Sequence, residues 1–537
     1  MKKKTLLITS IVFVIILVLF FCVFHSFNSE MKEYHFSSLN TDKLEDIIRN
    51  RKENDIEFEE ICFNGIPLIY DKEDHCFYYS LEEGNNEAFD PVVSCDTNGL
   101  KIAVENKKIS KELIANNESI EIVLYDNNRY SINRLVCTTL PLINIEKFYE
   151  DPDYEFDRCS FSVLDNRNGK YSYDVYKGEV RIRGGTMTSE LPKPGLRIKL
   201  DKVLKGDNNV NEKYYDILGL ERDNEFVLYT CNIEKDHIRN VFTTNLWYDT
   251  CAEENDLGVK LGMSYRYCEV FMNNHYWGLC AIGNPISEKR NYVDLDKNSD
   301  KYPLENIYKL NYFGDREKMD YEKYGNDYLF FIKTNEDNPD AWKPFIDYMK
   351  LLLYSSDKLE LYKSINLDNA LDIYLFYNMT QAWDNAWFED NLKFRNTYLV
   401  SKVQDDGSIK MYYIPWDLDR CWGHEREDGL DYLMDYTKNY PMVMNPVENL
   451  LEMDDPEIKE LLYFKYHKLR DDKWSDSAIL DMLDKYEDQA YKSGAFFRDS
   501  ARWPENYHAD NTNLDEFKEY VINRIHYFDQ YIEDIFS

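Results

Sequence analysis

A switch in hydrophobic spacing divides the sequence into a strand-rich first part and a helix-rich second part. From Ile56 to about Thr139, short apolar runs alternate with turn residues, and further strand-type runs follow from Leu140. After Tyr312, apolar residues recur mainly at helical spacing, interrupted by one more strand pair. Sheets first and helices later predict an α+β protein whose main domain has two lobes.

The length of the chain implies more than one compact unit. A chain of 537 residues is too long for one ordinary hydrophobic core. We therefore predict five segments: a transmembrane anchor at 1–24, a stalk at 25–55 ending in a short helix, a small all-β module at 56–139, a two-lobed main domain at 140–430, and a helical C-terminal extension of that domain at 431–537.

The N-terminal segment has the composition of a membrane anchor. Three lysines, Lys2–Lys4, precede an uncharged run from Thr5 to Phe24, and about 20 apolar residues suffice to span a bilayer. A cleaved signal peptide is the alternative, but its apolar region is usually shorter and ends in small residues. We therefore expect a single-pass membrane protein with a cytoplasmic N-terminus and its main domain outside.

The charge balance is strongly acidic. Asp and Glu total 99 against 64 Lys and Arg, which gives a net charge of −35. A field of this sign repels nucleic acid phosphates, so we expect no nucleic acid partner. A nucleotide held with a metal ion in a local basic pocket remains compatible with this charge.

One pair of predicted strands concentrates positive charge. Arg181 and Arg183 alternate with apolar residues, as do Arg197 and Lys199, so each pair shares one face of its strand. If the two strands pair, four cations line one side of a sheet, where a phosphate is the natural ligand. Ordinary surface ion pairs are the alternative.

The acidic candidates lie around the strand pair in the second part. Asp417 and Asp419 follow an apolar strand at i, i+2 spacing, an arrangement that suits Mg²⁺. Upstream lie Asp384 and Asn391. One Asp to orient a hydroxyl, one Asn to hold a metal and another Asp to bridge metal and phosphates form a minimal phosphoryl-transfer set. Acidic surface turns are the alternative in so acidic a chain.

Other recognised chemistries have little support. Asp236 and Arg239 can pair at i, i+3 on a helix, which favours a structural role for the Asp-His-Ile-Arg-Asn segment. The sequence contains no G-x-S-x-G or G-x₄-G-K-[ST] motif and no H-x₃-H pair. Acyl-enzyme chemistry, a P-loop and a zinc site are therefore not expected.

Taken in order, these segments resemble the CotH family of spore-coat proteins, an atypical branch with a protein kinase-like fold. The matching segments are LPLINI at 140–145, IRGGTMTSELPKPGLRIKL at 182–200, DHIRN at 236–240, EVFMNNHYWGL at 269–279, and DN…N…IPWDLDRCWG across 384–423. The resemblance covers about 140–430 and implies a two-lobed kinase-like domain there.

The resemblance also implies an activity and its residues. The domain would bind ATP with Mg²⁺ or Mn²⁺ and phosphorylate Ser or Thr of surface or spore-coat proteins. Asp417 matches the metal-binding Asp of the family, Asp419 lies beside it, and Asp384 matches the catalytic Asp, with Asn391 as a metal ligand and Asn396 as an alternative for that role. Lys199, with Arg183 and Lys193, would contact the phosphates.

The sequence departs from the family pattern at two positions, which leaves other functions open. Asn284 stands where the family usually has Glu, and Arg183-Gly184-Gly185-Thr186 replaces the Arg-Gly-x-Ser element. A catalytically inactive scaffold for surface or spore-coat assembly is therefore the main alternative. A sugar-active enzyme with paired carboxylates is a third reading, although it gives the basic strand face no role.

Overall fold

The structure is a computed structural model in which two compact units are distinguished. Unit 1 comprises Met1–Thr138 and Asn168–Tyr173, and unit 2 comprises Thr139–Arg167 and Asp174–Ser537. The structure describes the chain except for residues 1–31, 36, 40, 59, 84–90, 96, 98, 106–108, 148–153, 185–192, 202–213, 232–233, 235, 291, 311–329, 387–394, 428–429, 434, 440–444, 505–513 and 537.

Unit 1 consists of two sheets with one main apolar core and a smaller apolar cluster that includes Leu44 of α2. One sheet has the order β1 (Lys32–His35), β8 (Val92–Cys95), β4 (Ile61–Phe63) and β5 (Ile66–Pro67). The other has the order β2 (Ser37–Leu39), β9 (Lys101–Glu105), β10 (Ile120–Tyr125), β11 (Arg129–Thr138), β7 (Cys76–Ser80) and β6 (Ile69–Asp71), with β3 (Lys52–Glu53) beside β11. Two short helices, α2 (Thr41–Arg49) and α3 (Lys111–Ala115), complete the unit. The segment predicted as a stalk thus supplies β1, β2, α2 and β3.

The membrane prediction requires correction. Within the described part of the chain, no helix combines the length and apolar character that crossing a membrane demands. This finding contradicts the expected single-pass localisation. The run on which that expectation rested, residues 5–24, lies outside the described residues.

A closed barrel forms the first part of unit 2. Its strands follow the order β12 (Leu142–Lys147), β13 (Asp157–Asp165), β14 (Ser172–Arg183), β15 (Gly195–Leu200), β16 (Glu225–Tyr229), β18 (His275–Gly283) and β17 (Tyr265–Met272). Period-2 alternation explains the barrel, because Val180, Ile198 and Leu200 point into its apolar interior. The strands β17 and β18 form a hairpin whose turn residues Asn273 and Asn274 both have positive φ, as tight hairpin turns require.

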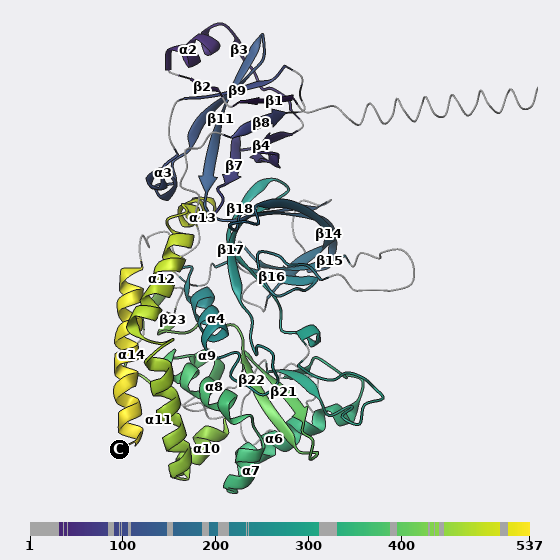
Figure 1. Ribbon diagram of the computed structural model, residues 1–537, viewed down its shortest axis with the longest axis vertical. Helices are drawn as coiled ribbons and strands as arrows, with labels where there is room; N and C mark the ends of the chain where they lie inside the picture. Colours follow the sequence, from purple (N-terminus) through teal and green to yellow (C-terminus); the bar gives the residue numbers. More distant parts are fainter. Residues whose placement is uncertain are drawn as a thin grey trace, which may run out of the picture. The chain divides into compact units, whose positions relative to one another are not determined.

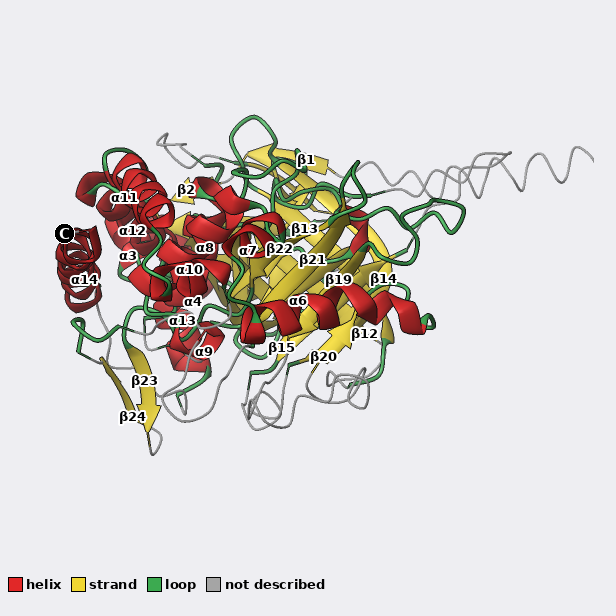
Figure 2. Ribbon diagram, turned by 90° about the horizontal axis from the view of Figure 1, so that it is seen from below, coloured by secondary structure: helices red, strands yellow, loops and turns green. Residues whose placement is uncertain are grey.

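The second part of unit 2 surrounds a small sheet with helices. The sheet order is β20 (Phe330–Ile332), β19 (Asn306–Leu310), β21 (Thr397–Val403) and β22 (Ile409–Pro415). Near it lie α4 (Arg239–Thr250), α6 (Lys343–Tyr354), α7 (Lys358–Lys363), α8 (Leu367–Met379) and α9 (Trp383–Ala386), seen from below in Figure 2. The predicted helix after Asp236 is therefore confirmed as α4.

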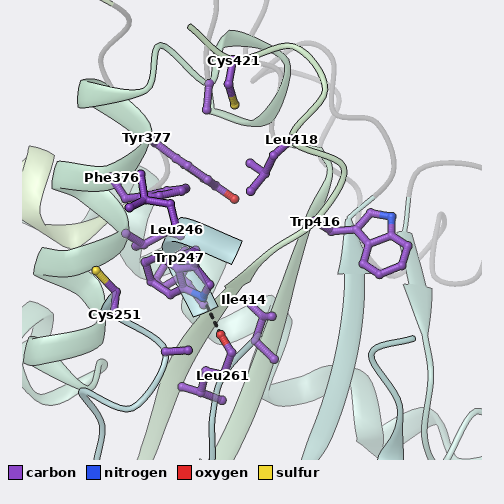
Figure 3. Close-up of a cluster of buried hydrophobic side chains, with 14 of the residues drawn as sticks. Leu246, Trp247, Cys251, Leu261, Phe376, Tyr377, Ile414, Trp416, Leu418 and Cys421 are labelled. Carbon is purple, nitrogen blue, oxygen red and sulfur yellow. Dashed lines mark hydrogen bonds between the residues drawn. The ribbon is translucent and has the colours of Figure 1, made fainter. Parts of the chain in front are cut away.

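The helices α4 and α8 lie in the main core of unit 2. Nearly every residue of α8 is buried, including the polar residues Asn369, Asp372 and Asn378. Figure 3 shows Trp247 of α4 beside Phe376 of α8, with the indole N–H of Trp247 donating to the Leu261 carbonyl oxygen at 2.6 Å. In the same view Trp416, at the end of β22, points away from the other labelled side chains.

The remaining described elements are mostly C-terminal helices. They are α10 (Pro446–Glu452), α11 (Pro456–Arg470), α12 (Asp476–Ala490), α13 (Ala495–Arg502) and α14 (Asp515–Phe536), preceded by the hairpin β23 (His424–Glu427) and β24 (Leu430–Leu433), while the 3₁₀ turns Glu288–Arg290 and Pro339–Trp342 lie earlier in the chain. Figure 1 shows α11, α12 and α14 side by side. The chain is therefore a mixed α+β protein with several sheets, as the sequence predicts.

The helix α14 holds the end of α8. Arg524 is fully buried and donates to the carbonyl oxygens of Asn378 and Met379, at 2.6 and 3.0 Å. Tyr520 donates to Gln381 Oε1 at 2.6 Å. Because the last carbonyls of a helix have no partner within it, Arg524 satisfies groups that would otherwise be buried without one. This fixes the start of the segment that leads to Asp384.

Candidate functional site

The strand β22 ends in an acidic turn that we call the acid loop, Trp416–Asp419. Asp417 is exposed and has a φ of 58°, a left-handed conformation that Asp tolerates better than most residues. Leu418 is buried in the core, and Asp419 beside it is also buried. The loop thus presents one carboxylate to solvent and holds a second one against the protein.

The start of α4 supports the acid loop from the interior. Asp236 and Arg239 form the predicted ion pair, at 2.7 Å and buried on both sides. Arg239 also donates to the carbonyl oxygens of Cys421 and Trp422, each at 2.9 Å. Asn240 Oδ1 accepts from the backbone N–H of Leu418 at 3.2 Å. The Asp-His-Ile-Arg-Asn segment therefore positions the acid loop.

The electrostatics of these buried acids follow from their surroundings. Burial alone would raise the pKa of Asp236, but Arg239 and two backbone N–H groups outweigh it and hold that pKa below its usual value. Glu234 nearby forms no ion pair with a cation in the part of the chain that the structure describes. Burial, followed by the charge of Asp236, raises the pKa of Glu234 to about 8.

The two carboxylates of the acid loop fit a divalent cation. Burial and then the charge of Asp417 raise the pKa of Asp419 to about 7, while Arg420 and Arg395 oppose the rise. A divalent ion would relieve this repulsion, and Mg²⁺ needs few protein carboxylates because it keeps several waters. No cluster of three or more His, Cys, Asp or Glu side chains able to hold a metal occurs in the described part of the chain.

Asp384 lies in the short helix α9 and is engaged by its neighbours. Arg395 forms an ion pair with Asp384 Oδ1, and Asn396 donates to Oδ2 at 2.9 Å. The carbonyl oxygen of Asn396 accepts from the backbone N–H of Trp416 at 3.0 Å. Arg395 also acts electrostatically on Asp419. Asp384 and the acid loop are thus close neighbours.

The predicted metal ligand Asn391 lies outside the described residues. Asn396, its alternative, is described and has a φ of 52°. Its side chain bonds to Asp384 and its backbone to the acid loop. In this arrangement Asn396 links the two acidic segments.

The basic strands pair as predicted. In the β14–β15 register Arg181 lies opposite Arg197 and Arg183 opposite Gly195. The guanidinium of Arg183 lies over the ring of Trp416, 5.3 Å from its centroid. Such cation–π contacts fix a cation without neutralising it. Arg183 is therefore brought to the acid loop at Trp416, the residue directly before Asp417 in sequence.

Lys199 lies further along the same strand. It is exposed and sits opposite Glu179 of β14 and Glu225 of β16. No hydrogen bond or ion pair links it to the acid loop within the part of the chain that the structure describes. The structure therefore brings Arg183 to the acidic residues and leaves Lys199 apart from them.

Lys193 occupies a structural position. Its side chain is fully buried, and Nζ donates to the carbonyl oxygens of Thr230 and Leu279 and to Asp499 Oδ1, at 3.0, 2.5 and 2.6 Å. An ammonium group has three N–H donors, and all three are engaged. We therefore correct its assignment as a phosphate contact: Lys193 anchors α13 to the barrel.

Two lysines that sequence reasoning missed lie near the acid loop. Lys309 is in the middle of β19, and Lys333 follows β20 directly. Burial, then Lys333, Arg183 and Arg197, lower the pKa of Lys309 to about 8, while Asp417 opposes the change. A lysine within an otherwise buried strand was the available signal.

Asn284 lies just after β18, and its hydrogen bond goes to Glu221 and not to the acid loop or the two lysines. Its side-chain amide donates to the Glu221 carbonyl oxygen at 3.0 Å, and the residue is buried. An ionised carboxylate could not donate this bond. The substitution at this position thus has a local structural role.

Comparison with known proteins gives one family match. The family model described as CotH kinase protein matches residues 180–528, which include β15, α4, the acid loop and most of α14. No curated protein matches the chain.

Proposed function

This chain belongs to the CotH kinase family, and from that premise we propose that it transfers the γ-phosphate of ATP to Ser or Thr side chains of surface or spore-coat proteins. The reaction would use Mg²⁺ or Mn²⁺. In this proposal the barrel and the helical part of unit 2 correspond to the two lobes of a kinase-like domain.

The observation that carries the proposal is the contact between Arg183 and Trp416. Trp416 begins the acid loop, while Arg183 ends a strand of the barrel. The contact therefore brings a cation suited to phosphate beside the carboxylates suited to a metal ion. Phosphoryl transfer needs this combination, because catalysis there consists mainly of positioning and charge stabilisation.

Each acidic residue has a distinct role in the proposal. Asp417 and Asp419 would hold the divalent ion, which neutralises charge on the phosphates. Asp384 would orient the acceptor hydroxyl and take its proton, and Asn396 would keep Asp384 in register with the acid loop. Arg183 would contact the phosphates.

A catalytically inactive scaffold for surface or spore-coat assembly is the second candidate. It is favoured by the ion pair between Asp384 and Arg395, which occupies the proposed catalytic carboxylate. Asn284, in place of the family Glu, points the same way. This function requires stable binding of a partner and no phosphoryl transfer.

The test compares wild type with Asp417→Asn in the full chain. Asn keeps the left-handed backbone at this position but is a weaker metal ligand. With labelled ATP and Mg²⁺ or Mn²⁺, wild type should label itself or a Ser-rich basic substrate, and the variant should lose the label while unfolding at a similar temperature. A wild type that neither transfers label nor shifts its melting temperature with nucleotide would exclude the kinase proposal.

A further inference from the structure

Two lysines, Lys309 and Lys333, have no role in the proposed catalytic set. Together with Arg183 and Arg197 they form what we call the cation cluster. Two of its members come from the barrel strands β14 and β15, and two from β19 and the end of β20. The cluster thus combines parts of the chain that are more than 100 residues apart.

Sheet register places the two lysines on one face. Lys333 donates its backbone N–H to the Ile307 carbonyl oxygen at 2.7 Å, so it continues the β19–β20 pairing opposite Ile307. Lys309 is two residues beyond Ile307 in the same strand, and alternate residues share a face. Diagonal neighbours of this kind have Cβ atoms about 7 Å apart, which is within the reach of two lysine side chains.

The same face leads to the acid loop. Lys309 lies opposite Tyr398 in the β19–β21 register, and the Tyr398 ring packs edge-on against Trp416 with 5.7 Å between centroids. Arg183 lies over the other partner of that contact, the Trp416 ring. A continuous row of contacts therefore runs from Lys309 through Tyr398 and Trp416 to Arg183.

The barrel side adds Arg197. Its guanidinium pairs with Glu225, but Glu225 also accepts from Lys289 at 3.0 Å, so that carboxylate is shared between two cations. Arg197 and Arg183 both act electrostatically on Lys309 and on Lys333, while Asp417 acts in the opposite sense on Lys309, and Glu288 and Glu225 do so on Lys333. Neither lysine forms an ion pair within 4 Å in the described part of the chain. The cluster therefore has a surplus of positive charge.

We infer that Lys309 and Lys333 bind the phosphate chain of a nucleoside triphosphate. Crowding like charges costs free energy, and a polyphosphate is the ligand class that would offset it. The protein as a whole has a net charge of −35, so a local surplus of positive charge departs from its overall composition. That the ligand carries a nucleoside rests on the proposed function. That it carries a phosphate chain rests on the cation cluster alone.

The test measures binding rather than activity. The full chain is titrated calorimetrically with ATP and with inorganic tripolyphosphate, and Lys309→Met and Lys333→Met are compared with wild type. Met keeps the length of the side chain and removes its charge. We expect each substitution to weaken both ligands roughly 10- to 100-fold, as the loss of a charge-assisted hydrogen bond does. Lys309→Arg should retain most of the affinity.

The matched control is Lys350→Met, an exposed lysine of α6. It should leave both affinities unchanged, and all variants should unfold like wild type. If Lys309→Met fails to fold, the lysine is structural, the inference fails for it, and Lys333→Met decides the remainder.

The outcomes separate this inference from the kinase proposal. Tripolyphosphate binding that is lost in the variants, without phosphoryl transfer by wild type, would support the cluster and reject the kinase. Phosphoryl transfer with unchanged affinities in both variants would support the kinase and overturn the cluster. A wild type that binds neither ligand would overturn both.

Discussion

Lys193 is buried and Lys309 partly buried in unit 2, and their surroundings differ in charge. Lys193 is fully buried with Asp499 and two carbonyl oxygens around its Nζ. Burial would lower the pKa of Lys193, yet Asp499 outweighs it and raises that pKa. Around Lys309 three further cations lie near, and burial together with them lowers its pKa to about 8.

The difference in surrounding charge indicates a different role for each lysine. A buried charge with every donor engaged contributes to the fold, and removing one partner leaves the other unpaired. A charge held among like charges weakens the fold and is retained where a ligand uses it. The residue type is the same in both places, so only the surroundings distinguish anchor from binding site.

The largest predicted effect tests the anchor. Lys193→Met should reduce the free energy of unfolding by about 3–5 kcal/mol, because Asp499 would remain buried without its cation. Urea denaturation followed by tryptophan fluorescence measures it. A loss below about 1 kcal/mol would contradict the assignment of Lys193 as an anchor.

A glycine substitution sharpens the same point. A Cβ at Gly278 would clash with Asp499 Oδ1 and approach Lys193 Nζ at 2.9 Å, and Gly278 has a φ of +130°. Gly278→Ala should therefore destabilise by about 2–3 kcal/mol. Gly258→Ala is the control: its φ is +69° but its Cβ would meet no atom within 4 Å, so it reports backbone strain alone, about 1–2 kcal/mol. Equal losses for both variants would show that Asp499 and Lys193 are not packed against Gly278.

The pH dependence of Lys309 predicts two opposite trends. Its pKa is about 8 in the folded protein against an ordinary value of 10.5, so the protonated side chain weakens the fold below pH 8. This penalty fades as the pH rises from about 8 to 10.5. Wild type should thus gain stability relative to Lys309→Met across that window, while its affinity for tripolyphosphate falls. A difference in the free energy of unfolding between wild type and Lys309→Met that is the same at pH 7.5 and at pH 9.5 would contradict the trend.

The smallest effect comes from an exposed pair. Asp488 lies in the last turn of α12 and Lys492 follows just after the helix, four residues on, and both side chains are largely exposed. Asp488→Asn should change the free energy of unfolding by no more than about 0.5 kcal/mol. Thermal unfolding at low and high salt checks this. A larger change would mean that an exposed ion pair stabilises the fold as well as a buried one, so burial would not be needed to explain the loss expected for Lys193→Met.

Local patterns predicted much of the fold. The alternation of Arg181, Ile182 and Arg183 predicted a strand with a basic face, and the paired strands β14 and β15 confirm it. Asp236 and Arg239 pair as their i, i+3 spacing indicated. Such predictions succeed because the spacing itself determines which side chains share a face.

The site depended on contacts that spacing does not encode. Lys193 and Asp499 are 306 residues apart, so no periodicity could have shown that they meet. Lys309 gave only a weak signal, a single lysine in an apolar strand. The roles of Asp384, Asp417 and Asp419 came from residue type, spacing and a resemblance, and they remain predictions.

The contacts of α14 have a consequence for biosynthesis. Arg524 and Tyr520 hold the segment just before Asp384, and the Tyr520 hydroxyl packs against Gly423 just beyond the acid loop. These two residues are synthesised 139 to 146 residues after the groups before Asp384 to which they donate hydrogen bonds. A ribosome must therefore translate α14 before the acidic residues can reach their final geometry, so nascent unit 2 stays incomplete until this helix emerges.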